Sequence, residues 1–126
     1  MKIQNLYERL SARENLVFAA RLYGTPKRRV DQLLAQVGLA DRARDRIKNY
    51  SNGMKQRLLI ARALIHQPDL ILADEPTGNL DSVTGQSIMN LLRELNEEQG
   101  ITLVVVTHDQ EVAAYADRIV RLRDGQ

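Results

Sequence analysis

Two adjacent carboxylates follow a short apolar run in the second half of the chain. The run covers residues 70–73, and Asp74 and Glu75 come directly after it. A continuous apolar run of this length predicts a strand that is covered on both faces, and α/β sheets bind ligands at the carboxyl ends of their strands. One carboxylate there can hold Mg²⁺ against phosphates, and the next can orient or deprotonate a water molecule. Alternatively, the acidic pair only ends the strand and turns the chain.

A histidine follows a second apolar run. Residues 102–106 are rich in β-branched side chains, which predicts another buried strand, and His108 stands two positions after it. If the two strands are parallel neighbours, His108 lies near Glu75, where an imidazole can contact a terminal phosphate and position an attacking water. Alternatively, His108 only bonds a loop carbonyl. The other histidine, His66, stands at a predicted helix end and is interpreted as a partner of the helix dipole.

A small polar turn, Ser51-Asn52-Gly53, precedes a basic helix. The free backbone N–H groups at such a helix start, the Ser51 hydroxyl and the positive end of the helix dipole together make an anion site. The alternative is an ordinary helix cap.

Helices dominate the first half of the sequence. Ser11 and Glu14 have the S-x-x-E spacing of a capping box, and Thr25-Pro26 is typical of a cap followed by the first helical residue. The expected segments are a helix from about Ala12 that Gly24 ends, a helix from Pro26 that Gly38 ends, a partly helical stretch over residues 39–50, and a helix capped by Ser51 that runs to about His66.

Strands and helices alternate in the second half, which is typical of an α/β fold with parallel strands. The expected elements are a strand at residues 70–73, a loop at 76–81, a helix from Asp81 to about Glu98, a strand at 102–106, a short helix at 110–115, a strand at 119–122 and a tight turn at 124–125.

The composition excludes several classes of protein. The chain has 126 residues, of which 44% are hydrophobic and none is cysteine, which excludes a disordered chain, a disulfide scaffold and a thiolate metal site. No apolar run approaches the roughly 18 residues of a membrane span, and the N-terminus is charged where a secretory signal would be apolar.

Residues 1–66 contain 14 Lys and Arg against 5 Asp and Glu, whereas residues 67–126 contain 4 against 11. The basic half could bind nucleic acid, or it could pair with the acidic half or with an anionic ligand.

Taken together, these clusters resemble the ATP-binding cassette (ABC) ATPase family over essentially the whole chain. Residues 51–57 look like the family's signature motif, residues 70–74 like its Walker B motif with Glu75 as the catalytic glutamate, and residues 78–81 like its D-loop. His108 looks like the switch histidine. Residues 6–16 look like the segment after the Q-loop, and Gln4 resembles that loop's glutamine at a shorter spacing than usual.

The resemblance implies a fold and a division of the chain. The fold class is α/β, with a partial P-loop NTPase-like parallel sheet and an N-terminal helical signature subdomain. Residues 1–66 would hold the Q-loop remnant and the helical subdomain. Residues 67–126 would hold the catalytic core with the Walker B motif, the D-loop and the H-loop.

The resemblance also implies a mechanism. Two such domains would pair head to tail around ATP and Mg²⁺, with Asp74 holding the metal, Glu75 polarising the water and His108 securing the γ-phosphate. The expected cofactor contacts come from Ser51, Asn52, Gly53, Met54, Asp81 and Gln4. The implied partners are a second ABC ATPase domain and a transmembrane permease subunit, with no nucleic acid. The implied location is cytoplasmic, at the cytoplasmic face of the inner or plasma membrane.

One motif of the family is absent from the 126 residues. They contain no G-x-x-x-x-G-K-[ST] loop, which would cradle the phosphates and supply a lysine. We therefore expect the chain to be the C-terminal part of a nucleotide-binding domain and to be inactive alone. Two alternatives stay open: a non-transport ABC ATPase that acts on DNA or ribosomes, and a non-catalytic split subunit that supplies only the signature half-site.

Two departures from the family pattern concern its subgroups. Asn52 and Met54 stand where glycine and glutamine are usual, and Met54 before Lys55 resembles exporters of drugs, haem or polysaccharides. Residues 75–82 resemble instead the ATPases of lipoprotein-release and macrolide-export systems. The two halves therefore indicate an intermediate lineage, a chimera or an unusual source.

Overall fold

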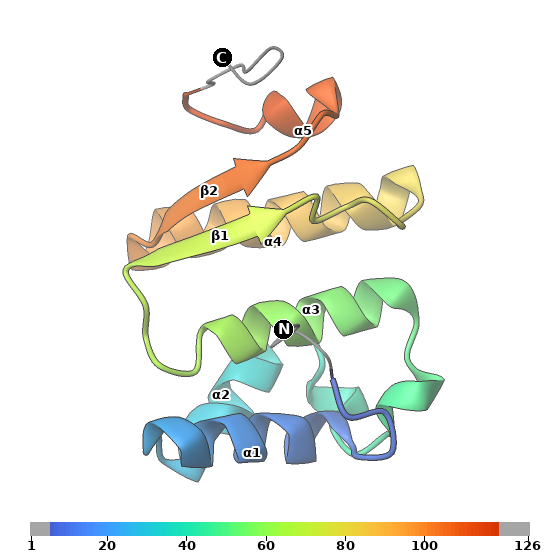
Figure 1. The fold of residues 1–126 in the computed structure, drawn as a ribbon, viewed down its shortest axis with the longest axis vertical. Coiled ribbons are helices and arrows are strands. Elements are labelled where there is room, and N and C mark those ends of the chain that lie inside the picture. Colours follow the sequence, from blue (N-terminus) through green and yellow to red (C-terminus); the bar gives the residue numbers. More distant parts are fainter. Residues whose placement is uncertain (1–5, 119–126) are drawn as a thin grey trace.

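The computed structural model describes residues 6–118, which form a helical layer beside a smaller α/β layer (Figure 1). The elements are α1 (Ala12–Tyr23), α2 (Lys27–Gln36), η1 (Ala40–Arg42), η2 (Ile47–Asn49), α3 (Asn52–Ala63), β1 (Leu70–Asp74), α4 (Ser82–Gln99), β2 (Thr102–Val106) and α5 (Gln110–Ala113). The α/β fold predicted from the sequence is confirmed. The predicted strand at 119–122, the turn at 124–125 and Gln4 lie outside the described residues.

Local hydrogen bonds explain where three of the helices begin. The Ser11 hydroxyl accepts the Glu14 N–H at 3.1 Å, and the Glu14 carboxylate accepts the Ser11 N–H at 2.9 Å, so the predicted capping box is confirmed. Ser51 caps α3 and Asp81 caps α4, as predicted, and each accepts the N–H of the residue three positions on. These caps satisfy backbone donors that have no partner inside the helix.

The predicted start of α2 is wrong by one residue. Pro26, and not Thr25, is the N-cap, and the helix begins at Lys27. The Thr25 hydroxyl donates instead to the Ile65 carbonyl oxygen at 3.3 Å. Because this partner is 40 residues away, the local pattern around Thr25 does not indicate it.

The end of α3 also differs from the prediction. The helix ends at Ala63, three residues before the predicted end. The ring of His66 stacks on Tyr23 with 4.7 Å between the ring centroids. Arg29 supplies a cation from another element at this helix end, and its Nη2 donates to the Leu64 carbonyl oxygen at 3.3 Å. A cation there stabilises the last carbonyl groups of a helix.

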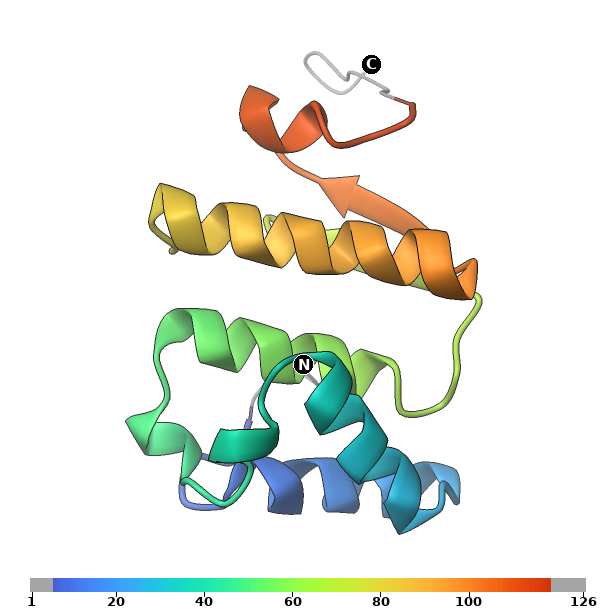
Figure 2. The ribbon, with the colours of Figure 1, turned by 180° about the vertical axis from the view of Figure 1, so that it is seen from behind.

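The two described strands are parallel neighbours, as the sequence predicts. Leu70 pairs with Thr102 at one end, and Asp74 pairs with Val106 at the other. α4 connects the strands and lies along one face of the sheet (Figures 1 and 2). Both strands therefore end at the same edge of the sheet.

The prediction that both faces of these strands are covered is wrong for the described residues. Ile71 is buried, but Leu70 and Leu72 are 55% and 64% exposed, and Val104 and Val106 are 42% and 51% exposed. Side chains alternate between the two faces of a strand. The described part of the chain covers the face toward α4 and leaves the other face open.

One hydrophobic core joins the helical layer to α4. α3 lies between them and contacts α1, α2 and α4. Leu58 of α3 and Leu64, the residue directly after this helix, are fully buried, as are Ile88 and Leu92 of α4, and all four belong to the same cluster. This packing holds α3 against α4.

Candidate functional site

The element ends that carry the predicted site residues lie on one side of the molecule. In Figure 1, α3 and α4 begin on the right, and β1 and β2 run from left to right toward that side. Ser51 and Asp81 cap these two helices, whereas Glu75 and His108 follow the two strands. The fold therefore brings the separate sequence clusters to one side.

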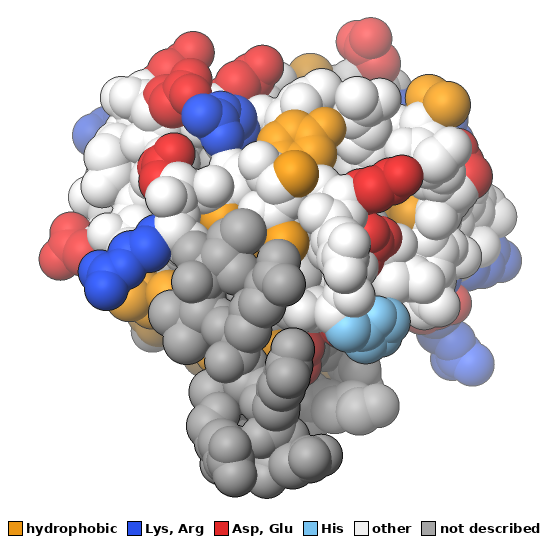
Figure 3. Space-filling model, turned by 90° about the horizontal axis from the view of Figure 1, so that it is seen from above, with side chains coloured by type: hydrophobic (Ala, Val, Ile, Leu, Met, Phe, Trp, Pro, Cys, Tyr) orange, Lys and Arg blue, Asp and Glu red, His pale blue; other side chains and the backbone are white. Residues whose placement is uncertain are grey.

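Glu75 and His108 are in direct contact. The Oε1 atom of Glu75 accepts the His108 backbone N–H at 3.0 Å, and Nε2 of His108 lies 3.5 Å from the same oxygen. The His108 side chain is 94% exposed, whereas that of Glu75 is 34% exposed. On the face shown in Figure 3, a histidine side chain lies beside acidic side chains. The imidazole is thus free to turn toward a ligand while the carboxylate stays in place.

The backbone of Glu75 is in the left-handed region, with φ of +46°. This conformation is uncommon for a residue with a side chain and is often found at functional sites. The Glu75 N–H donates to the Val106 carbonyl oxygen at 2.7 Å, and the Glu75 carbonyl oxygen accepts the Gly78 N–H at 3.1 Å. These two bonds hold the turn that directs the carboxylate toward the end of β2.

Asp74 lies exposed at the end of β1, next to this pair. Among residues 6–118, no three or more His, Cys, Asp and Glu side chains are grouped so that they could hold a metal ion. Mg²⁺ commonly binds one or two carboxylates together with phosphate oxygens and waters. An exposed carboxylate such as Asp74 suits that mode of binding.

The start of α3 is docked on the start of α4. Ser51 Oγ accepts the Met54 N–H at 3.1 Å. Gly53 lies so close to α4 that a Cβ there would be 2.5 Å from Cγ2 of Thr84. Thr84 in turn donates its N–H to Asp81 at 3.2 Å. Thr84 therefore joins the polar turn to the loop that contains Asp81.

The starts of α3 and α4 both favour negative charge: the first can bind an anion, and the second carries the Asp81 carboxylate. Ser51 and Asn52 are exposed, and the first N–H groups of a helix can bind phosphate oxygens. Hydrogen bonds from the side chain and the backbone of Thr84 lower the pKa of Asp81 below its ordinary value. The Asp81 carboxylate is therefore ionised, which is favourable at the positive end of α4.

Two threonines of this region were not among the residues predicted from the sequence. Thr107 Oγ1 donates to Oε2 of Glu75 at 3.2 Å and accepts the Asp109 N–H at 3.0 Å. Thr84 contacts Gly53 and Asp81, as described above. The available signal was position alone: Thr107 stands between the strand and the candidate histidine, and Thr84 is the third residue of a capped helix.

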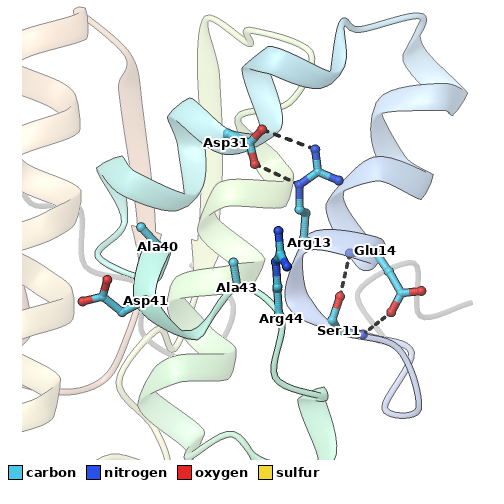
Figure 4. A pocket seen from close by; sticks show the side chains of 8 residues that line it. All are labelled: Ser11, Arg13, Glu14, Asp31, Ala40, Asp41, Ala43 and Arg44. Carbon is cyan, nitrogen blue, oxygen red and sulfur yellow. Dashed lines mark hydrogen bonds and ion pairs between the residues drawn. The ribbon is translucent and has the colours of Figure 1, made fainter.

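A separate hollow lies in the helical layer and contains none of the predicted site residues (Figure 4). It is lined by Ser11, Arg13, Glu14, Asp31, Ala40, Asp41, Ala43 and Arg44. Nε of Arg13 donates to Oδ1 of Asp31 at 2.9 Å, and the hydrogen bonds from Arg13 lower the pKa of Asp31. Arg13, Asp31 and Glu14 thus already have partners within the protein.

The chain is similar to proteins of one family. The family model described as "ABC transporter" matches residues 2–78. The lipoprotein-releasing system ATP-binding protein LolD of Syntrophus aciditrophicus is 45% identical over 129 residues, which cover 99% of this chain and 58% of that protein. The macrolide export ATP-binding/permease protein MacB of Rhodopirellula baltica is 60% identical over 94 residues, which cover 75% of this chain and 14% of that protein.

Solved structures give the same result for the fold. The dimeric structure of MJ0796, a bacterial ABC transporter cassette, matches with a TM-score of 0.81 and 41% identity, over 99% of this chain and 57% of that chain. Its post-hydrolysis state bound to ADP and Pi matches with a TM-score of 0.77 and 42% identity, over the same shares. The chain therefore spans little more than half the length of LolD and MJ0796. Because the LolD match covers 99% of the chain, both halves resemble one relative.

Proposed function

The chain belongs to the ABC transporter family, and we propose that it forms part of the ATP-binding subunit of an exporter. The observation that carries this proposal is the contact between Glu75 and His108 at the ends of two parallel strands, on the same side as the polar turn and Asp81. The names of the LolD and MacB relatives, which refer to lipoprotein release and macrolide export, support an export role.

In the proposed reaction, ATP is hydrolysed to ADP and phosphate. Bound ATP and Mg²⁺ would supply the phosphoryl group and a metal that neutralises its charge. Asp74 would hold the metal, Glu75 would orient the attacking water and take its proton, and His108 would donate a hydrogen bond to a γ-phosphate oxygen. The remaining proposed contacts to nucleotide, some of them across the dimer, come from Ser51, Asn52, Gly53, Met54, Asp81 and Gln4.

The proposed partners are a second cassette domain, paired head to tail, and a membrane permease. The MJ0796 structures are dimeric, and the MacB relatives are named as ATP-binding/permease proteins, which supports both partners. Among the described residues, no helix is long and apolar enough to cross a membrane. We place residues 1–66 as the helical subdomain that reaches the permease at the cytoplasmic face of the membrane, and residues 67–126 as the catalytic core.

The test of this function compares the chain alone with the chain completed by a phosphate loop. The 126 residues contain no such loop, so we expect weak ATP–Mg²⁺ binding and no hydrolysis by the purified chain. Adding a cassette segment that carries the loop should restore ATP hydrolysis, and Glu75→Gln in this chain should abolish it. Hydrolysis by the chain alone, or restored hydrolysis that does not depend on Glu75, would contradict the proposal.

A second candidate function is that of a split subunit that supplies only the signature half-site. The docking of the polar turn on α4 favours it, because Ser51, Gly53 and Asp81 are held together without any phosphate loop. The matched test uses a complete partner cassette whose own signature serine has been replaced. If this chain restores ATP hydrolysis by that partner, the second function predicts that Ser51→Arg in this chain abolishes the rescue. It also predicts that Glu75→Gln leaves the rescue intact.

The alternative of a nucleic-acid substrate rests on the basic first half. Three basic side chains of that half form ion pairs with acidic side chains of the same half, which reduces the free positive charge. We therefore propose no nucleic-acid partner. A mobility shift of duplex DNA or ribosomal RNA by the chain at physiological salt would contradict this.

A further inference from the structure

Thr107 connects two turns through a single hydroxyl group. Its Oγ1 atom accepts the Asp109 backbone N–H at 3.0 Å and lies 3.2 Å from Oε2 of Glu75. A threonine hydroxyl has one proton to donate. Because a carboxylate oxygen can only accept and the Asp109 N–H can only donate, that proton is directed at Glu75.

The two oxygens of the Glu75 carboxylate have different surroundings. Oε1 accepts the His108 backbone N–H at 3.0 Å and lies 3.5 Å from the His108 imidazole. Oε2 accepts the hydrogen bond from the Thr107 hydroxyl. A carboxylate oxygen accepts about two hydrogen bonds, so Oε2 keeps an acceptor position for a further donor.

The backbone alone does not determine where this carboxylate lies. Glu75 has an uncommon positive φ, and its side chain has rotatable bonds that the turn leaves free. The hydrogen bonds that hold the Glu75 carboxylate come from Thr107 and His108, which are 32 and 33 positions further along the chain. The His108 imidazole is almost fully exposed, whereas Thr107 is partly buried and is tied to Asp109.

We propose that Thr107 is a positioning residue that holds Glu75 so that Oε2 faces the attacking water. This inference rests on the proposed function and adds a residue to it. The hydroxyl of Thr107 fixes the rotation of the carboxylate plane, while the His108 backbone anchors Oε1. Thr107 itself contacts neither the nucleotide nor the reacting atoms.

The first experiment measures the position of Glu75 in the 126-residue chain by NMR, with no nucleotide present. Thr107→Val keeps the shape of the side chain and removes the hydroxyl, whereas Thr107→Ser keeps the hydroxyl. We expect Thr107→Val to shift the Glu75 Cδ resonance and to speed hydrogen exchange of the Asp109 amide. Thr107→Ser should leave both close to the parent values, and unchanged core methyl resonances, such as those of Ile88, show that each variant is folded.

The second experiment measures steady-state ATP hydrolysis after completion of the site with a segment that carries the phosphate loop. Thr107→Val should lower kcat roughly tenfold, the effect of losing one hydrogen bond to a charged group, with little change in KM for ATP. Thr107→Ser should stay within about twofold of the parent. A change in KM alone would contradict positioning, because it would place Thr107 in nucleotide binding.

The outcomes separate this inference from the proposed function. If Thr107→Val leaves the Glu75 and Asp109 resonances and kcat at parent values, the positioning role is wrong. If the resonances move as expected and the completed parent hydrolyses no ATP, the proposed function is wrong and the contact holds Glu75 for another purpose. If the resonances move and kcat is unchanged, Thr107 has only a structural role and the inference is overturned.

Discussion

Among single residues, Gly53 of the polar turn packs against Thr84 of α4. A Cβ on residue 53 would meet Cγ2 of Thr84 at 2.5 Å, a separation at which one of the two must move. Packing against Thr84 therefore favours glycine at position 53, whether or not a ligand binds there. Because residue 53 lies in the first turn of α3, a shift there also displaces Ser51.

We expect Gly53→Ala to destabilise the chain by about 1 kcal/mol. Overpacking costs roughly 1–3 kcal/mol, and the higher helix propensity of alanine offsets up to about 1 kcal/mol of this. Urea unfolding followed by circular dichroism measures the change. Thr84→Ser is the matched background, because it removes Cγ2 and keeps the hydroxyl. A cost that is the same in both backgrounds would show that the contact is not its cause.

Asp81, the N-cap of α4, makes the stability of the chain depend on pH, and its hydrogen bonds with Thr84 set the sign of this dependence. Thr84 lowers the pKa of Asp81 in the folded chain, whereas in the unfolded chain it titrates near about 3.9. The carboxylate therefore contributes stability above that pH, and the contribution is lost as the pH falls through the folded value. We expect the parent to be more stable than Asp81→Asn at pH 7, and the difference to shrink below about pH 4. Unfolding curves of both proteins at the two pH values measure this, and a constant difference would contradict it.

At the scale of elements, Asn15 attaches the segment before α1 to the helix. It is 4% exposed, and its side chain accepts the Tyr7 N–H at 2.8 Å and donates to the carbonyl oxygens of Tyr7 and Ser11 at 3.1 and 2.8 Å. These three hydrogen bonds therefore hold the segment against the start of α1. In the proposed function, this segment leads from the Q-loop into the helical subdomain.

We expect Asn15→Ala to lower the free energy of unfolding by about 2 kcal/mol. The loss of three hydrogen bonds leaves buried or half-buried backbone groups without partners. Asn49→Ala is the matched control, because Asn49 is exposed and such a change is usually within about 0.5 kcal/mol. Thermal unfolding of the two variants compares them, and equal effects would show that the Tyr7 contacts contribute little.

At the scale of the whole molecule, the uncovered sheet face is the feature that needs explanation. Leu70, Leu72, Val104 and Val106 lie exposed on two adjacent strands, and exposed apolar patches of this kind mark interfaces or associate. The chain spans 58% of the LolD relative. Whatever covers this face in a complete cassette, residues 6–118 leave it open.

We expect the purified chain to self-associate through this face in a concentration-dependent manner. Leu72→Lys should weaken the association at least about tenfold, because burial of one leucine side chain contributes roughly 1.5–3 kcal/mol. Val83→Lys is the control, since Val83 is 76% exposed and lies at the start of α4, outside the sheet. Sedimentation velocity over a concentration series measures the change. Equal effects of the two substitutions, or a monomeric parent, would contradict the prediction.

Features that depend on residues close together in the chain could be predicted from the sequence. The capping box at Ser11, the caps at Ser51 and Asp81, and the alternation of strands and helices all follow from patterns a few residues long. Parallel pairing of the two strands also follows, because a helix such as α4 brings the chain back to the same end of the sheet. The nearness of Glu75 and His108 could therefore be predicted.

Features that depend on residues far apart in the chain are visible only in the folded structure. Thr25 bonds a carbonyl 40 residues away, Gly53 fits against Thr84, and Thr107 holds Glu75 across 32 residues. The open face of the sheet is of the same kind, since an apolar run has the same sequence whether one or two of its faces are covered. Such contacts depend on how the elements pack, and short-range patterns in the sequence do not contain that information.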